Sequence, residues 1–146
     1  MDSYVRHVRP RWSDMDVFGH VNHANLVTLL EEARVPLLFE ESAGAGLGDF
    51  AKGLVVVRLD VRYRRQITVA GQDLRVRMSL PQVRNATFTL AYEVHAGPSA
   101  EDEVAATAET VLAPFDVARQ RPRRLSGAER DFLVERLAAG KVPVDG

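Results

Sequence analysis

The sequence predicts an α+β domain in which one long helix covers one face of a five-stranded antiparallel sheet, with a short helix near the C-terminus. Two observations carry this prediction. Apolar residues first follow a helical period after a single extended segment, and four segments with a period of two come next. The chain has 146 residues, which suits a single domain with one core over residues 1–146. Because only one long helix is present, it must cover one face of the sheet.

The first extended segment is Tyr4–Trp12, and Pro10 confines it to an edge or to the end of a strand. Apolar residues then recur at steps of three and four: Leu26, Leu29, Leu30, Ala33, Leu37 and Leu38. This spacing predicts a helix from Ala24 to about Glu41 that buries one face. Pro36 lacks the N–H for a helical hydrogen bond, so we expect a kink or an early end there.

Four segments of alternating character follow, at residues 57–64, 74–80, 88–94 and about 104–115. In the first of them Val57, Leu59, Val61 and Tyr63 alternate with charged residues, which predicts one dry face. Short polar connections predict an antiparallel meander. Ser126 and Glu129 form a capping-box pattern ahead of a terminal amphipathic helix.

One helix cannot shield the whole sheet, and residues 54–57 form an apolar run, Leu-Val-Val-Val. Sheets with exposed apolar edges commonly pair between subunits. We therefore expect a homodimer or homotetramer, with the polar cluster described below at the subunit interface.

Charge and composition exclude several classes of function. The 19 Lys and Arg residues balance 20 Asp and Glu residues, which argues against nucleic acid or an anionic membrane as partner. Without cysteine, the chain has no disulfide, thiolate metal site or cysteine nucleophile. The N-terminus lacks a signal-peptide pattern and no apolar run is long enough to span a bilayer, so a soluble cytoplasmic protein is expected.

Residues 11–25 crowd two carboxylates, Asp14 and Asp16, and two imidazoles, His20 and His23, just ahead of the helical pattern. A helix N-terminus offers unpaired N–H groups and the positive end of the helix dipole, which stabilise a developing oxyanion. A nearby carboxylate can act on the nucleophile. The segment therefore predicts a site for acyl transfer.

The stretch Trp12–Asn25, with its Asp-x-Asp-x-x-Gly-His motif, and the following Leu30–Arg34 resemble the signature of hotdog-fold acyl-CoA thioesterases of the 4-hydroxybenzoyl-CoA thioesterase type. Val61–Arg65 and Ala105–Val111 resemble later strands of that family, so the similarity covers about residues 4–125. The resemblance implies a hotdog fold, in which the five-stranded sheet wraps around a central long helix. It also implies an acyl-CoA or acyl-carrier thioester as substrate, and it requires no metal or organic cofactor.

By the same resemblance Asp16 is the catalytic carboxylate, and the backbone N–H of His23 is the oxyanion donor. An ionised aspartate can attack a thioester directly, giving a mixed anhydride, or it can activate water. Both routes remain open. For Asp14 a capping or turn role is the better interpretation, and Asn22 is placed to cap the helix.

The two imidazoles admit a second interpretation, in which His20 and His23 join Asp14 and Asp16 as ligands of a metal-dependent hydrolase. That spacing needs a helix that has begun at His20, and Gly19 opposes this. We instead expect Gly19, His20 and Asn22 to pack and form hydrogen bonds around the substrate. A third interpretation is a module that binds acyl-CoA without turnover.

Arg64 and Arg65 have the side chains to bind the phosphates of coenzyme A, although solvated arginines are common at strand ends. Glu31 lies two helical turns beyond His23 and could face the site. The alternative, which we favour, is an ion pair between Glu31 and Arg34.

Overall fold

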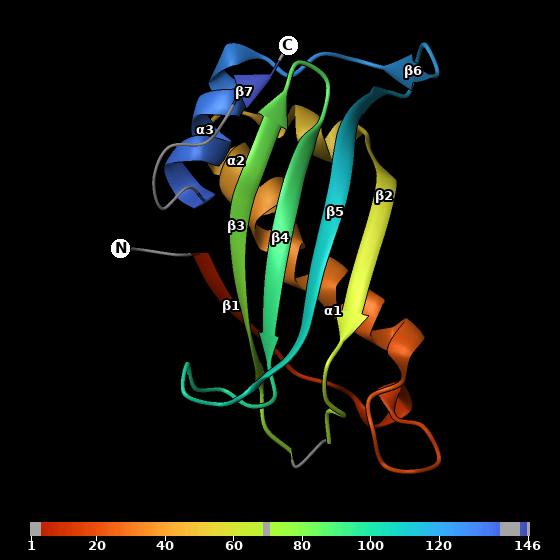
Figure 1. Ribbon diagram of the computed structural model, residues 1–146. Helices are drawn as coiled ribbons and strands as arrows, with labels where there is room; N and C mark the ends of the chain where they lie inside the picture. The colour runs from red at the N-terminus through yellow and green to blue at the C-terminus, as the bar shows by residue number, and fades with distance from the viewer. Residues whose placement is uncertain (1–3, 69–70, 138–143, 146) are drawn as a thin grey trace.

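The computed structural model describes residues 4–68, 71–137, 144 and 145 of the chain (Figure 1). Five strands form an antiparallel sheet in the order β1-β3-β4-β5-β2, as predicted. Their bounds are β1 Tyr4–Val8, β2 Leu54–Tyr63, β3 Leu74–Arg84, β4 Phe88–His95 and β5 Val104–Asp116. Two very short strands extend it, because β6 (Arg121–Pro122) pairs with β5 and β7 (Val144–Asp145) pairs with β3.

The predicted meander is confirmed for β3, β4 and β5, which are neighbours in the sheet. It is wrong for β2, which pairs with β5 at the edge opposite β1. Residues 64–73 separate β2 from β3, more than the two to five or so residues of a hairpin loop. The chain therefore leaves one edge of the sheet and returns near the other.

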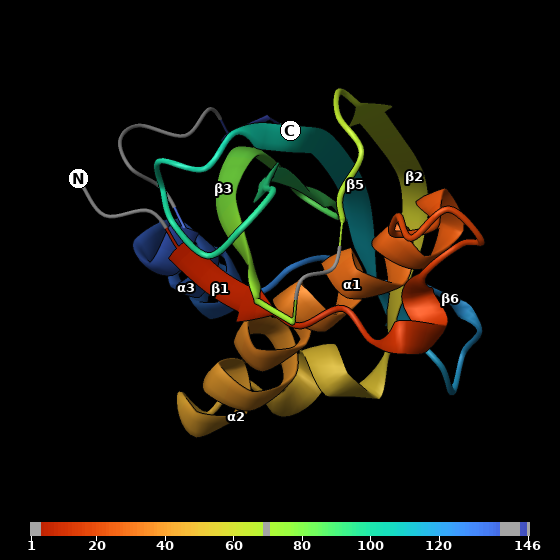
Figure 2. The ribbon, with the colours of Figure 1, turned by 90° about the horizontal axis from the view of Figure 1, so that it is seen from below.

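The long helix lies against one face of the sheet, whose strands form an arc over it (Figure 2). Helix α1 runs from His23 to Val35, and the chain continues as a π-helical segment, Pro36–Glu41, and a short α2, Ser42–Gly44. The α-helical pattern thus ends just before Pro36, as predicted, because proline cannot donate the next hydrogen bond. Leu29, Leu30 and Leu37 are almost completely buried under the sheet. Two short 3₁₀ segments flank these helices, Trp12–Asp14 and Gly48–Lys52.

Helix α3, Gly127–Leu137, packs beside β3 and buries Phe132 and Leu133. Its start confirms the predicted capping box: the Glu129 N–H donates to Ser126 Oγ (3.0 Å) and the Ser126 N–H donates to Glu129 Oε1 (2.9 Å). No helix in the described part of the chain is long and apolar enough to cross a membrane.

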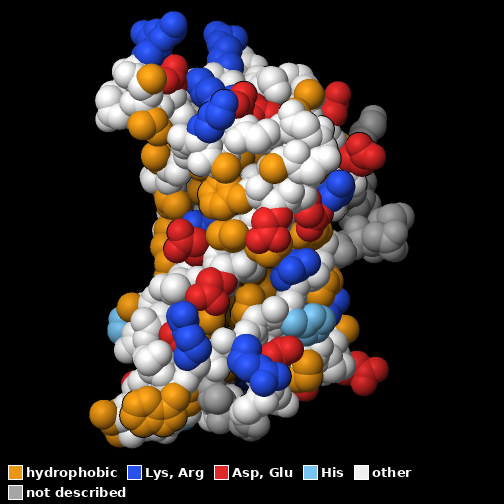
Figure 3. Space-filling model, turned by 180° about the vertical axis from the view of Figure 1, so that it is seen from behind, with side chains coloured by type: hydrophobic (Ala, Val, Ile, Leu, Met, Phe, Trp, Pro, Cys, Tyr) orange, Lys and Arg blue, Asp and Glu red, His pale blue; other side chains and the backbone are white. Residues whose placement is uncertain are grey.

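The dry face predicted for β2 is wrong in the single chain. Val57 is 60% exposed and Leu59 is 41% exposed. A register shift between Val56 and Arg58 puts Val57 out of step with β5, and no described strand pairs with the other side of β2. Seen from behind, hydrophobic side chains form a band along the edge where β2 runs (Figure 3). Burial along β2 therefore does not alternate as the sequence predicts, and several of its apolar side chains are left uncovered.

Candidate active site

The polar cluster folds into a small closed loop between β1 and α1. The Asp16 N–H donates to the His20 carbonyl (2.8 Å), and the Asn22 N–H donates to the Asp14 carbonyl (2.7 Å). The Gly19 N–H donates to the Asp16 carbonyl (3.2 Å), and this hydrogen bond closes the tip of the loop. Gly19 there has a φ of 78°, in the left-handed region that favours glycine. The motif glycine is therefore used for its backbone conformation.

Gly19→Ala is expected to lower the free energy of unfolding by about 1 kcal/mol, because an L-residue with a side chain is strained at this φ. A Cβ there meets nothing within 4 Å, so the cost is conformational and not steric. Urea unfolding measures it. Gly44→Ala is the matched control, since Gly44 is equally uncrowded but helical and lacks a positive φ. Equal stability of the two variants would contradict the assignment.

The two oxygens of Asp16 are used differently. Its Oδ1 accepts hydrogen bonds from the N–H groups of Phe18 (2.8 Å) and His20 (3.1 Å). The bond from His20 is the main reason that the pKa of Asp16 lies below its usual value; partial burial opposes this, and the Phe18 bond adds to it. Within the described residues Oδ2 has no hydrogen-bond partner. Asp16 is therefore held in place, ionised at neutral pH, with one oxygen left for chemistry.

The other acid of the motif has a structural role, as predicted. Asp14 is buried, and its Oδ2 accepts the Arg11 N–H (2.6 Å) at the start of the 3₁₀ turn. The Arg11 guanidinium also pairs with it (3.3 Å). The Asp14 carboxylate thus stabilises the turn that leads into the loop.

The start of α1 carries an unpaired N–H group. Asn22 is the N-cap, as predicted: its Oδ1 accepts the Ala24 N–H (2.8 Å), and its carbonyl accepts the Leu26 N–H (3.0 Å). In the described ranges nothing accepts a hydrogen bond from the His23 N–H. The group that the resemblance implies as oxyanion donor is therefore available at the positive end of the helix.

Asp16 and His23 line one cavity of about 360 Å³. Arg64, Arg65 and Tyr63 line it from β2 and the residues that follow, so the structure brings most of the predicted site together. Gly19, His20 and Asn22 do not line this cavity; their contacts shape the loop and cap the helix.

Sequence reasoning missed Tyr63, and also Val21 and Ile67, which line the same cavity. The Tyr63 hydroxyl donates to the His23 carbonyl (2.8 Å), and its ring meets the His23 ring edge-on with centroids 6.4 Å apart. The His23 imidazole therefore packs against Tyr63. The available signal was an aromatic residue with a polar tip, directly before two arginines at the end of a strand.

The two arginines differ in their surroundings. Both backbone N–H groups donate to the Ala105 carbonyl, which fixes the chain where it leaves β2. The Arg65 side chain pairs with Glu103 (2.7 Å), whereas the Arg64 guanidinium has no ion pair with any described residue. Arg64 is thus the cation of the two that is open to an anionic ligand.

The predicted ion pair between Glu31 and Arg34 is wrong. Arg34 is buried, and its guanidinium donates to the Tyr92 hydroxyl (3.2 Å), while Glu31 is exposed. Helical spacing allowed the pair, but Arg34 points into the core. Over residues 4–68, 71–137 and 144–145 no three His, Asp or Glu side chains gather as metal ligands would.

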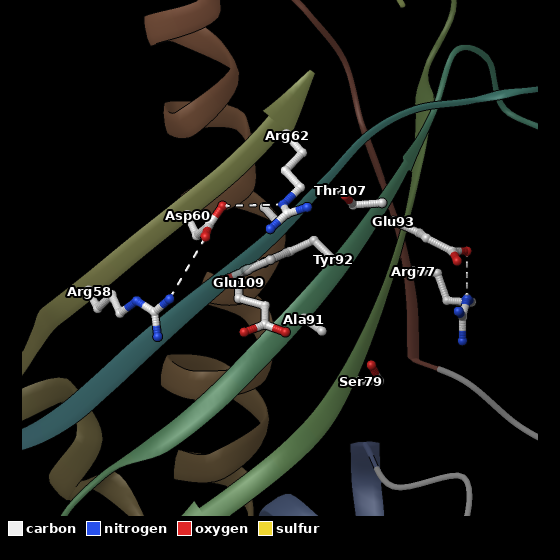
Figure 4. A pocket seen from close by; sticks show the side chains of 11 residues that line it. Arg58, Asp60, Arg62, Arg77, Ser79, Ala91, Tyr92, Glu93, Thr107 and Glu109 are labelled. Atoms are coloured by element: carbon white, nitrogen blue, oxygen red, sulfur yellow. Dashed lines mark hydrogen bonds and ion pairs between the residues drawn. The ribbon is translucent and has the colours of Figure 1, made fainter. Parts of the chain in front are cut away.

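A second cavity, of about 390 Å³, lies on the sheet face turned away from α1 (Figure 4). Its walls are charged, with contacts between Asp60 and both Arg58 and Arg62, and between Arg77 and Glu93. It contains no helix N-terminus, and none of the predicted site residues lines it, so it is not part of this site.

A curled antiparallel sheet over a long helix is the arrangement of the hotdog fold. The model of the thioesterase-like superfamily matches residues 10–137, and the chain belongs to that superfamily. The predicted fold and family are both confirmed.

Among curated proteins, the chain is 28% identical to the long-chain acyl-CoA thioesterase FadM of Escherichia coli (strain K12), over 126 residues covering 86% of this chain and 93% of that protein. A thioesterase from Thermus thermophilus complexed with coenzyme A and Zn is 26% identical, with a TM-score of 0.73, covering 92% of this chain and 96% of that one. A predicted thioesterase from Bacillus stearothermophilus has the same fold, with a TM-score of 0.76 at 24% identity over 95% and 100% of the two chains.

Proposed function

We propose that this protein is an acyl-CoA thioesterase that hydrolyses an acyl thioester to a carboxylate and a free thiol. One observation carries the proposal. Asp16, whose Oδ2 has no hydrogen-bond partner among the described residues, lines the same cavity as His23, whose N–H at the helix start is unpaired among those residues. Family membership and the similarity to FadM support it.

In the proposed reaction the thioester carbonyl oxygen accepts the His23 N–H, which stabilises the negative charge that develops there. Asp16 Oδ2 either attacks the carbonyl carbon or removes a proton from an attacking water. Direct attack expels the thiolate and gives a mixed anhydride, which water then cleaves to regenerate the aspartate. In the general-base route water adds to the carbon, and the thiolate leaves and is protonated.

We further propose that Arg64 and Arg65 contact the phosphates of coenzyme A, since guanidinium groups suit phosphate oxygens and both residues line the cavity. Arg64, without an ion pair among the described residues, contributes more. The loop residues Gly19, His20 and Asn22 hold the walls around the thioester. An acyl-carrier thioester presents one phosphate where coenzyme A presents three. Phosphate contacts from the two arginines would therefore favour coenzyme A as the carrier.

The test is thiol release from short, medium, long and aromatic acyl-CoAs, and from the matching acyl-pantetheines, with and without a chelator. We expect turnover that ignores the chelator and a higher KM for pantetheine esters. Turnover abolished by the chelator would instead support a metal-dependent hydrolase. Binding of acyl-CoA without thiol release from any thioester would overturn the proposal in favour of a binding module.

We also propose that two copies join through β2, in a homodimer or a homotetramer built from such dimers. The strand has a free edge among the described strands, and its Val55, Val56 and Val57 are exposed. Pairing with a second copy would satisfy the edge and cover these side chains. Tyr63, the last residue of β2, bonds the His23 carbonyl, so a junction along β2 would lie near the site.

Val57→Lys is expected to halve the mass in solution, to that of one chain (16.2 kDa) if the wild type is a dimer, because lysine on an edge strand opposes pairing. Light scattering after size exclusion measures the mass. Phe39→Lys, a similar change at an exposed position away from β2, serves as the control and leaves the assembly intact. A wild-type protein that is already monomeric would overturn this proposal.

A further inference from the structure

Tyr63 stands where the edge strand β2 meets the first residue of α1. Its hydroxyl donates to the His23 carbonyl across 40 positions of sequence, and its ring lines the cavity with Asp16. The ring is half exposed, and burial of the remainder raises the pKa of its hydroxyl. The hydroxyl therefore stays protonated, and able to donate, throughout the neutral and mildly alkaline range.

This hydrogen bond adds to the support of two consecutive peptide groups. The peptide between His23 and Ala24 is held at its N–H by Asn22 Oδ1 (2.8 Å), and its carbonyl, at the first residue of α1, accepts the Tyr63 hydroxyl as a second hydrogen bond besides the helical one. The preceding peptide is held at its carbonyl by the Leu26 N–H (3.0 Å), and its own N–H is the unpaired group of His23. Because peptide groups are planar, fixing both planes fixes the direction of that N–H.

We propose that Tyr63 is a positioning residue: its hydroxyl holds the first turn of α1 so that the His23 N–H stays directed at the thioester oxygen. This inference rests on the proposed function. Alignment of a donor with the position of the developing charge is what makes an oxyanion site effective, and small misplacements are costly.

The helix does not need this bond in order to form. Asn22 already caps it, and the partly exposed Tyr63 hydroxyl exchanges a hydrogen bond with water for one with the carbonyl, for a small net gain. If Tyr63 had a purely structural role, removing its hydroxyl would change stability, kcat and KM only slightly. A positioning role predicts an effect on the transition state and not on substrate binding.

Tyr63→Phe removes only the hydroxyl and keeps the ring against His23. We expect kcat to fall about tenfold with KM nearly unchanged, as when an interaction made only in the transition state is lost. In ¹⁵N relaxation measurements the His23 amide should become more mobile than in the wild type. Both readouts use the full chain and the acyl-CoA that gives the highest turnover.

Tyr92→Phe is the matched control. It deletes a hydroxyl that bonds Thr110 (2.8 Å) and Arg34 in the core, away from the cavity. It should lower the melting temperature and leave kcat unchanged, which separates stability from catalysis.

A kcat for Tyr63→Phe within twofold of the wild type, or a KM that rises as much as kcat falls, would overturn the positioning role. These results can be told apart from a failure of the proposed function. If the proposed function is wrong, the wild type itself releases no thiol. If only the positioning role is wrong, the wild type is active, Asp16→Asn is inactive, and only Tyr63→Phe departs from its expected result.

Discussion

Asp16→Asn is expected to reduce kcat for thioester hydrolysis by about a hundredfold to ten-thousandfold, the range for loss of acid–base catalysis. Asparagine retains an Oδ1 that can accept the N–H groups of Phe18 and His20, so the loop keeps its shape. The amide is neither a nucleophile nor a base. Thiol release measures the rate, and an unchanged melting curve shows that the fold is intact.

Asp73→Asn is the control for this prediction. Asp73 pairs with Arg9 on the surface (2.8 Å) and lies outside the cavity, so turnover should be unaffected. Near wild-type turnover by Asp16→Asn would remove Asp16 from the mechanism and return the catalytic assignment to the other groups of the cavity.

The pH dependence of kcat/KM gives a second test of the role of Asp16. Because the His20 hydrogen bond lowers the pKa of Asp16, the ionised form persists below the ordinary value of about 4. The acid limb of kcat/KM should therefore lie below about pH 4. A limb near pH 6 would indicate a histidine in place of Asp16.

Arg123→Ala is expected to cost about 3 kcal/mol of stability, the largest loss among the ion pairs of the described residues. Its guanidinium makes two bonds to Glu129 (2.9 and 2.8 Å), whose side chain is only 3% exposed. Removing the arginine leaves a buried carboxylate without its charge partner. Thermal unfolding should show a fall of roughly 10 °C.

Acid unfolding tests the same pair. Burial alone would raise the pKa of Glu129, but the hydrogen bonds from Arg123 and the Ser126 N–H outweigh it and lower the pKa. The pair thus stabilises fully above the unfolded pKa of about 4.3, and this stability is lost as the pH falls through the lower folded value. Arg123→Ala should lose this component of the acid dependence, and adding Glu129→Gln should restore part of the stability. A change of less than about 2 °C in Arg123→Ala would contradict the assignment.

Local signals predicted the parts of the fold that depend on neighbouring residues. The Asn22 cap, the helix end before Pro36 and the Ser126–Glu129 capping box all involve residues within four positions of each other. The loop around Asp16 is similarly local, so the proximity of Asp16 to the helix start followed from the motif.

Contacts between distant segments were harder to predict. Arg34 bonds Tyr92, 58 positions away, and helical spacing alone suggested Glu31 instead. The place of β2 beside β5 depends on which edge is free after β3, β4 and β5 have paired, and alternation within the strand does not carry that information. The Tyr63–His23 bond was missed for the same reason, since it exists only because β2 ends over the start of α1.

The uncovered edge of β2 also bears on how the single chain behaves in solution. Residues 54–57 are strongly β-forming, uncharged and free of proline, and the first charge is Arg58. Such a segment, exposed on a free edge, favours pairing with the edge of another chain. Under the pairing through β2 proposed above, the newly synthesised or dissociated chain is therefore the species most prone to aggregation.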